Sequence, residues 1–228
     1  MDKGISICIP TYEYDGMGGL FLTELFESIL KQDFKDYEVC VSDHSVDDEI
    51  EKLCKEYRNS FPMVYYRNIY DRDNSPANTN CAIDLAQREI VKIMFQDDWF
   101  YSDSALSLIS RSMNKTWLVC GCNHFHGGKF TRTMIPRWND KIFERNTISS
   151  PSVLTIKGDV ADRFDTELIM KMDVDYYYRL YQLYGEPVII DEPLITNRLH
   201  NKQISAQYKR MKKKIPNEYD YCKKKYSI

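Results

Sequence analysis

Four aspartates stand where a carboxylate could act on a bound molecule. Asp43 comes directly after one apolar, strand-like run, and the pair Asp97 and Asp98 comes after another. In a parallel sheet, ligands bind at the edge where the strands reach their carboxyl ends. We therefore predict that these three carboxylates face one cleft. Asp173 lies in a segment with helical character and is the fourth candidate.

Asp97 and Asp98 have the chemistry expected of a metal site. Adjacent carboxylates repel one another unless a cation lies nearby. Their oxygens are hard ligands that suit Mg²⁺ or Mn²⁺, and such an ion can bridge a diphosphate. From their position alone, Asp97 and Asp98 could instead belong to a solvated loop that leads into a helix cap. His200 could add a nitrogen ligand to the same ion, although a lone loop histidine is the commoner case.

Asp43 and Asp173 suit two other tasks. A carboxylate at the end of an early strand can accept hydrogen bonds from a ribose or a base N–H, but the residues around Asp43 are also typical of a turn. An aspartate on the inner face of a helix can serve as a general base. Asp173 and Asp175 point in different directions, so at most one faces a given site. The alternative for Asp173 is a surface acid.

Two further interpretations concern the second half of the chain. Arg198 could pair with diphosphate oxygens or lie on the surface. A rival metal site would use alternate residues of one strand, namely Cys120, Cys122, His124 and His126. A straight strand spreads these four side chains over roughly 20 Å, which is too far for one tetrahedral ion. Structural zinc is therefore disfavoured.

The elements that must position these residues alternate between strands and helices. We expect strands at 5–9, 37–42, 64–67, 90–95, 117–122, 153–156 and 188–190, and helices at 22–30, 47–60, 75–87, 102–113 and 165–184. Ser75 is predicted to cap its helix. Residues 123–150 are expected to form an irregular excursion and 193–205 an ordered loop. The alternation predicts an α/β fold with a mainly parallel, Rossmann-like sheet and helices on both faces.

The composition is that of a globular domain. The chain has 228 residues and a net charge of −3, so its electrostatics argue against nucleic acid as a partner. No apolar stretch reaches the roughly 20 residues that span a bilayer, and no signal peptide is recognised. Seven cysteines show no disulfide-framework spacing. We expect a cytoplasmic protein.

The end of the chain is richer in Lys and Arg than the rest. We therefore divide the sequence into a domain at 1–205 and a basic extension at 206–228. Lys and Arg clusters attract anionic lipid headgroups, so a peripheral membrane contact is one interpretation of the extension. A solvated terminal segment is the other. The chain lacks the glycine-rich, Gly-x-Ser-x-Gly and His-Glu-x-x-His signatures of kinases, dehydrogenases, hydrolases and zincins.

Six short motifs occur in a fixed order along residues 4–205. They are Ile7-Cys8-Ile9-Pro10-Thr11-Tyr12, Val41-Ser42-Asp43-His44-Ser45, Ser75-Pro76-Ala77-Asn78-Thr79-Asn80, Phe95-Gln96-Asp97-Asp98-Trp99, Met172-Asp173-Val174-Asp175 with Arg179-Leu180, and Pro193-Leu194 with Arg198-Leu199-His200 and Ser205. The set resembles the family 2 glycosyltransferases, which have the GT-A fold and invert the configuration at the anomeric carbon of the transferred sugar. The sequence departs from that pattern at Ser42, Thr79, Phe95 and Met172; Phe95 stands where the metal motif often has its first Asp.

The resemblance implies a role for each matching position. Nucleotide-binding roles fall on Pro10, Thr11, Tyr12, Asp43, Asn80 and Arg198. Metal-binding roles fall on Asp97, Asp98 and His200. Asp173 would take the proton from the acceptor hydroxyl.

These roles lead to one expected function and two alternatives. The chain is expected to move a sugar from a nucleotide-diphosphate sugar, with a UDP-sugar favoured, to the hydroxyl of a glycan or other acceptor, using Mn²⁺ or Mg²⁺. Such a reaction belongs to glycan or polysaccharide synthesis. The alternatives are a nucleotidyltransferase, which would need a basic residue in the loop 12–19, and a catalytically inactive module that binds a nucleotide-sugar or a carbohydrate.

Overall fold

The computed structural model describes residues 3–204, 206 and 217–227 of the chain. Its strands are β1 (Ile5–Thr11), β2 (Tyr37–Asp43), β3 (Met63–Arg67), β4 (Ile90–Ile93), β5 (Trp99–Phe100), β6 (Trp117–His126), β7 (Lys129–Met134), β8 (Leu154–Lys157) and β9 (Val188–Leu199). Its helices are α1 (Met17–Leu30), α2 (Glu49–Tyr57), α3 (Ser75–Asp84), α4 (Ala105–Ser112), α5 (Met172–Tyr184) and α7 (Glu218–Tyr226), with a 3₁₀ turn η1 (Pro151–Val153).

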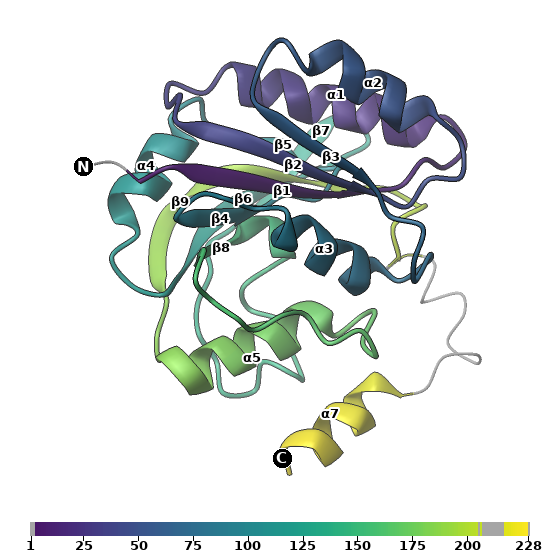
Figure 1. Cartoon of the computed structure of the whole chain (residues 1–228). Coiled ribbons are helices and arrows are strands. Elements are labelled where there is room, and N and C mark those ends of the chain that lie inside the picture. The colour runs from purple at the N-terminus through teal and green to yellow at the C-terminus, as the bar shows by residue number, and fades with distance from the viewer. Residues whose placement is uncertain (1–2, 205, 207–216, 228) are drawn as a thin grey trace.

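The strands form one sheet in the order β3-β2-β1-β4-β8-β6-β9-β5, with β7 paired to β6. The first four strands of this order run parallel, and β9 is parallel to β6. By contrast, β8 is antiparallel to both of its neighbours, and β7 and β5 are antiparallel to theirs. Figure 1 shows α1 and α2 on one side of the sheet and α3 and α5 on the other. The α/β fold with helices on both faces is confirmed, and its second half is a mixed sheet.

The buried strands explain why the first half of the fold is readable from sequence. Every residue of β1 and β2 is buried, because helices cover both faces of these strands, and their sequences are therefore nearly continuous apolar runs. In α1, the residues Leu22, Leu25, Phe26 and Ile29 recur at helical spacing and are fully buried against the sheet.

The irregular excursion that we expected at 123–150 is wrong over its first part, because 123–134 belong to a hairpin, whereas 135–150 contain no helix or strand. Strand β6 continues to His126, and β7 returns beside it as an antiparallel hairpin. Gly127 and Gly128 form the turn with φ values of 56° and 81°, which is the left-handed backbone that a two-residue hairpin favours. The hairpin was missed because its outer strand is exposed and polar, so it lacks the apolar alternation of a half-buried strand.

The predicted ordered loop at 193–205 is also wrong over its first half, because β9 continues through Pro193 to Leu199. Pro193 pairs with Gly121 of β6 at a shift in the register, which is where a sheet tolerates a proline. A side chain at Gly121 would lie 2.7 Å from the carbonyl oxygen of Glu192. The glycine therefore permits the two backbones to approach at the bulge.

Two predicted helix starts need correction. Helix α5 begins at Met172, whereas residues 165–171 form a turn and bends outside the helix. Asn74, and not Ser75, caps α3, since its side-chain oxygen accepts a hydrogen bond from the backbone N–H of Ala77. Both segments are polar and turn-like at their starts, so hydrophobic spacing did not locate the boundary.

The predicted basic extension lies partly outside the described residues, since 207–216 are not described. The described part is a docked helix and not a solvated tail. The Glu218 side chain of α7 is 4% exposed, and its carboxylate accepts three backbone N–H groups of residues 169–171 at 3.1, 2.8 and 2.7 Å. Lys225 pairs with Asp165 at 2.5 Å and with Asp175 at 2.9 Å.

Two features bear on the chemical environment. All seven cysteines are free. Among the described residues, no helix has the length and apolar character needed to cross a bilayer.

Candidate active site

The carboxyl edge of the sheet brings together Asp97 and His200, which are 103 residues apart. Asp97 lies in the turn after β4, and His200 directly follows β9. The His200 Nε2 atom is 3.1 Å from the Asp97 Oδ2 atom. The imidazole ring packs against Tyr14 and Phe21, with ring centroids 6.3 and 5.2 Å away. The predicted pairing of these two residues in space is therefore present, and aromatic packing fixes the orientation of the ring.

Asp98, the second predicted metal ligand, is occupied by other partners. Its Oδ2 atom accepts a hydrogen bond of 2.7 Å from the Asn197 side chain, and its Oδ1 atom accepts one of 2.9 Å from the backbone N–H of Arg198. Burial, followed by the neighbouring Asp97 charge, raises the pKa of Asp98 to about 8. The geometry gives Asp98 a structural role that ties the turn after β4 to β9.

Arg198 lies beside the site but does not face an open cavity. Its Nε atom donates to the carbonyl oxygen of Asp97 at 3.0 Å, and its terminal nitrogen is paired with Glu24. The guanidinium group is stacked between the rings of Phe21 and Trp99, at 4.4 and 4.5 Å from their centroids. In this arrangement Arg198 supports the turn that carries Asp97, and it would need to leave Glu24 to reach a diphosphate.

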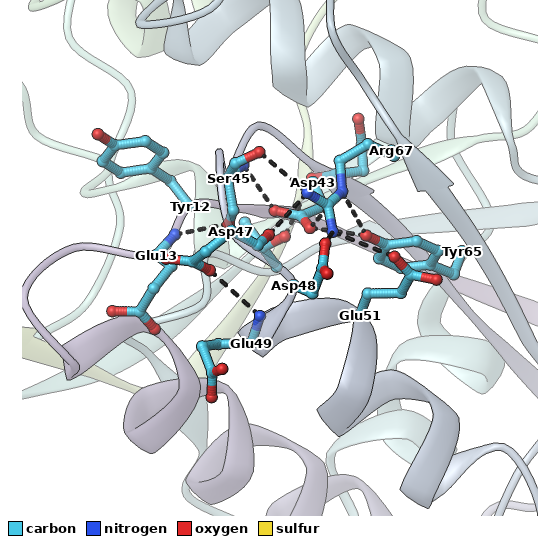
Figure 2. A network of polar contacts seen from close by, with 12 residues as sticks. Tyr12, Glu13, Asp43, Ser45, Asp47, Asp48, Glu49, Glu51, Tyr65 and Arg67 are labelled. Carbon is cyan, nitrogen blue, oxygen red and sulfur yellow. Dashed lines mark hydrogen bonds and ion pairs between the residues drawn. The ribbon is translucent and has the colours of Figure 1, made fainter.

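The second-strand aspartate, Asp43, lies in a closed network of polar contacts (Figure 2). Its carboxylate accepts hydrogen bonds from the Ser45 backbone N–H at 2.8 Å and the Tyr65 hydroxyl at 2.7 Å. The Arg67 Nε atom lies 3.3 Å from it, and the same guanidinium also contacts Glu51 at 3.2 Å. Asp43 is fully buried. A base could reach this carboxylate only if Tyr65 or Arg67 moved, and sequence reasoning missed both of these partners.

The other predicted nucleotide-binding residues lie at the end of β1. Pro10 and Thr11 are buried, and the Thr11 hydroxyl donates to the carbonyl oxygen of Ser42. The backbone of Tyr12 is held by the Gln96 side chain through two hydrogen bonds of 2.8 Å. The Tyr12 side chain is 42% exposed. Unlike the buried Pro10 and Thr11, it therefore offers a surface to a ligand, namely one face of its ring.

Asn80 does not join this group. Its side chain makes two hydrogen bonds of 2.8 Å with the backbone N–H and carbonyl of Phe164. It therefore ties α3 to the segment before α5, away from the end of β1. A local pattern cannot reveal this tertiary link, because the partner lies 84 residues away.

Asp173 lies in the first turn of α5. Its Oδ2 atom accepts a hydrogen bond of 2.6 Å from the Asn146 side chain, and its Oδ1 atom accepts one from the backbone N–H of Val174 at 2.7 Å. Burial raises the pKa of Asp173 to about 6, although these hydrogen bonds and Lys171 act in the opposite direction. The carboxylate is therefore ionised at neutral pH yet basic enough to accept a proton. Asn146 is a contact that sequence reasoning missed.

A cavity of about 690 Å³ connects Asp173 with the turn after β4. Asp97 and Asp98 line it on the side of the sheet, and residues 132–137 and 145–150 contribute to another part of its wall. Pro10, Tyr12 and Asp43 do not line this cavity. The structure thus brings the predicted base and the predicted metal ligand to one space, and separates both from the network around Asp43.

The rival zinc arrangement is not assembled. Cys120 and Cys122 are buried in the sheet, whereas His126 is exposed and contacts the carbonyl oxygen of Leu199. Within the described part of the chain, no group of three or more His, Cys, Asp or Glu side chains is placed to hold a metal ion by itself. Asp97 and His200 are a pair, so an ion bound there would take its remaining ligands from elsewhere.

Comparison with known proteins decides the family. The family model described as glycosyl transferase family 2 matches residues 6–178. The chain belongs to this family. The matched region covers β1 to the middle of α5, and so includes the turn with Asp97 and the helix with Asp173.

Two curated relatives of this family 2 chain are glycosyltransferases. The abequosyltransferase RfbV of Salmonella typhimurium is 35% identical over 104 residues, which are 44% of this chain and 30% of that protein. The GalNAc(5)-diNAcBac-PP-undecaprenol beta-1,3-glucosyltransferase of Campylobacter jejuni is 28% identical over 112 residues, which are 49% of this chain and 35% of that protein. The matches therefore span about a third of each relative.

Solved structures agree on the GT-A fold. S. aureus TarS 1–349 in complex with UDP-GlcNAc has a TM-score of 0.70 at 20% identity, and covers 88% of this chain and 60% of that one. The mannosyltransferase PcManGT of Pyrobaculum calidifontis, in complex with GDP-Man and Mn²⁺, has a TM-score of 0.64 at 15% identity, and covers 92% and 61%. This family 2 domain therefore has the fold that the sequence motifs predicted.

Proposed function

We propose that the chain transfers a sugar from a nucleotide-diphosphate sugar to an acceptor hydroxyl with inversion at the anomeric carbon. The observation that carries this proposal is the shared cavity, where Asp173, with its raised pKa, and Asp97, with His200 beside it, meet. A site for the leaving diphosphate and a base for the attacking hydroxyl are the two parts that such a displacement needs. The family and the two glycosyltransferase relatives support the same reaction class.

Asp97 and His200 would hold the metal ion. Adjacent ligands of an octahedral ion at about 2.1 Å lie about 3.0 Å apart. The observed separation of 3.1 Å between Asp97 Oδ2 and His200 Nε2 fits such a pair. A bound Mn²⁺ or Mg²⁺ would offset the negative charge that grows on the leaving diphosphate. Asp98 would support Asp97 through the backbone and would not be a ligand, because both of its oxygens already accept hydrogen bonds.

Asp173 would act as the general base. The acceptor oxygen forms a bond to the anomeric carbon while the bond from that carbon to the diphosphate oxygen breaks, and the diphosphate leaves with the electron pair. The acceptor proton passes to the Asp173 carboxylate. Asn146 and the backbone of Val174 hold that carboxylate in one orientation, which is how a positioned base gains its advantage over a free one.

The donor nucleotide would lie between Tyr12 and the turn after β4. UDP is our preferred nucleotide, which is supported by the structural neighbour TarS in complex with UDP-GlcNAc, whereas the neighbour PcManGT is in complex with GDP-Man. The exposed Tyr12 ring suits stacking against a base. Asp43 would shape the floor of the pocket through its closed network, and Pro10 and Thr11 would fix the end of β1. A glycan or other hydroxyl acceptor, and a place in glycan synthesis, are supported by the names of the curated relatives.

The test is a calorimetric titration of UDP, GDP, TDP and CDP, each with and without Mn²⁺, followed by a donor-hydrolysis assay. We expect one nucleotide to bind, and to bind more tightly with the ion. Binding of a nucleotide-sugar without any hydrolysis or transfer would favour a catalytically inactive binding module. No binding to any nucleotide by folded protein would refute the proposed donor site.

A further inference from the structure

One part of the cavity wall is strongly basic. The segment that runs through β7 and the loop after it contributes three arginines to the lining, Arg132, Arg137 and Arg145, and no acidic residue of that segment lines the cavity. The acids of the cavity come from the sheet edge and from α5. The cavity is therefore divided between an acidic side, where we place the transfer reaction, and a cationic side.

The three guanidinium groups have no carboxylate partner among the described residues. The arginines that hold the fold together are paired: Arg67 with Asp43, Arg163 with Asp84, Arg179 with Asp175, and Arg198 with Glu24. No ion pair or side-chain hydrogen bond engages Arg132, Arg137 or Arg145, and all three are exposed. Ion pairs within the fold thus account for the first four arginines, whereas no ion pair of the described residues accounts for the three arginines of the cavity.

The three arginines place positive charge on this side of the cavity. Arg132 lies directly opposite His124 in the hairpin, and burial together with the Arg132 charge lowers the pKa of His124. Three like charges around one cavity attract anions and raise their local concentration. Arginine also presents a planar fork of N–H donors that matches the oxygens of phosphate and carboxylate groups.

The position of the arginines favours the acceptor over the donor as the source of the anion. Asp97 and His200 already offer a place for the donor diphosphate at the sheet edge. The arginine segment instead reaches the base, since Asn146 of this segment donates its hydrogen bond to Asp173. An anion held here would therefore lie near Asp173, to which we assign the proton of the acceptor hydroxyl.

Resting on the proposed function, we propose that the acceptor carries a phosphate group and that Arg132, Arg137 and Arg145 bind it. The arginines would orient the acceptor so that its hydroxyl meets Asp173. Neutral sugars would be poor acceptors, because the cationic side would remain without an anion. The proposal assigns a substrate class to the part of the cavity that the donor does not occupy.

The experiment measures binding, so it does not depend on turnover. Phenyl phosphate, benzoate and benzyl alcohol are titrated by calorimetry into the full chain in Mg²⁺ buffer, with and without UDP at a saturating concentration. These probes share a ring and differ in the charged group. We expect phenyl phosphate to bind with or without UDP, benzoate to bind more weakly, and benzyl alcohol not to bind.

The triple variant R132Q/R137Q/R145Q should weaken phenyl phosphate binding at least about tenfold, because charge-assisted hydrogen bonds are lost. The control variant R58Q/R111Q/K224Q removes the same net charge from exposed positions that do not line the cavity, and it should bind as the wild type does. Unchanged binding by the first variant, or equal loss in both, would overturn the proposal. So would tighter binding of benzoate than of phenyl phosphate.

The UDP arm separates the two sources of a phosphate. If UDP displaces phenyl phosphate, or if the triple variant loses UDP affinity to the same extent, the arginines serve the donor and the proposal is wrong. Failure of the proposed function has a different signature, in which no nucleotide binds while phenyl phosphate still binds to the arginines.

Discussion

At the scale of single residues, Asp173 is the group on which turnover should depend most. General-base assistance contributes roughly 10²–10⁴ in rate. We expect Asp173→Asn to lower kcat by about that factor and to leave donor affinity nearly unchanged, because our proposal assigns the carboxylate to the acceptor. Single-turnover kinetics and donor titration would measure the two effects separately. The exposed Asp191→Asn is a control that should have no effect, and full activity in Asp173→Asn would rule out the assignment.

The raised pKa of Asp173 also predicts a pH dependence. A base must be deprotonated to act, so kcat should fall about tenfold per pH unit below the pKa of about 6 and level off above it. Asn146 donates to the carboxylate and thereby lowers this pKa. Asn146→Ala should therefore move the acidic limb of the profile to higher pH. A limb that stayed in place, or moved to lower pH, would mean that another group titrates.

His200 gives a prediction about the metal. Loss of a ligand should raise the Mn²⁺ concentration needed for half-maximal activity by at least about tenfold. We expect this for His200→Ala, while His124→Ala, which removes a histidine of β6 that lines the cavity, should keep the wild-type metal dependence. Activity measured against Mn²⁺ concentration tests both variants. Identical curves would remove His200 from the site.

At the scale of elements, helix α7 holds the start of α5 in place. Glu218 accepts three backbone N–H groups from residues 169–171, directly before the helix that carries Asp173. Loss of this buried carboxylate leaves those donors unsatisfied and should cost about 2–3 kcal/mol. For Glu218→Ala we expect Tm to fall by about 4–12 °C, measured by calorimetry, whereas the exposed Glu186→Ala should change it little. A Tm equal to that of the wild type would contradict this role.

The same elements show what sequence can and cannot predict. The strands β1, β2 and β4 follow from buried apolar runs, and α1 follows from its helical spacing, because local pattern and burial coincide there. Strand β7 escaped prediction since its residues are exposed, and β9 was cut short by Pro193, which the bulge opposite Gly121 accommodates. In these cases the pairing partner, and not the local sequence, decides the structure.

In the candidate site, too, some residues could be predicted from the sequence and others could not. Motif order indicated Asp97, Asp173 and His200, and the structure places the first two on one cavity with His200 against Asp97. Their supporting partners, such as Asn146 and Glu218, come from segments that are distant in sequence and carry no motif. A single sequence therefore indicated the candidate site residues but not the partners that hold them.

At the scale of the whole molecule, the site depends on contacts between the two halves of the sheet. Asp98, after β4, accepts hydrogen bonds from Asn197 and Arg198 of β9, and fully buried Lys92 of β4 donates to the carbonyl oxygens of Ser152 and Leu154. Burial lowers the pKa of Lys92 to about 8. Because these polar links join the parallel and mixed parts of the sheet, a ligand at the carboxyl edge should stabilise both together.

This connection predicts how the complete fold responds to its donor. A ligand present at 100 times its Kd and bound only to the native state adds about 2.7 kcal/mol. For a domain of this size, that corresponds to a rise in Tm of about 5–11 °C. We expect such a shift with UDP and Mn²⁺ together, as one cooperative transition in calorimetry. Asp97→Asn should lose the part of the shift that requires Mn²⁺ but keep the part caused by UDP alone. Two separate transitions on addition of UDP and Mn²⁺ would show that the two halves of the sheet are not coupled through this edge. A Mn²⁺-dependent shift that survives in Asp97→Asn would show that the ion binds elsewhere.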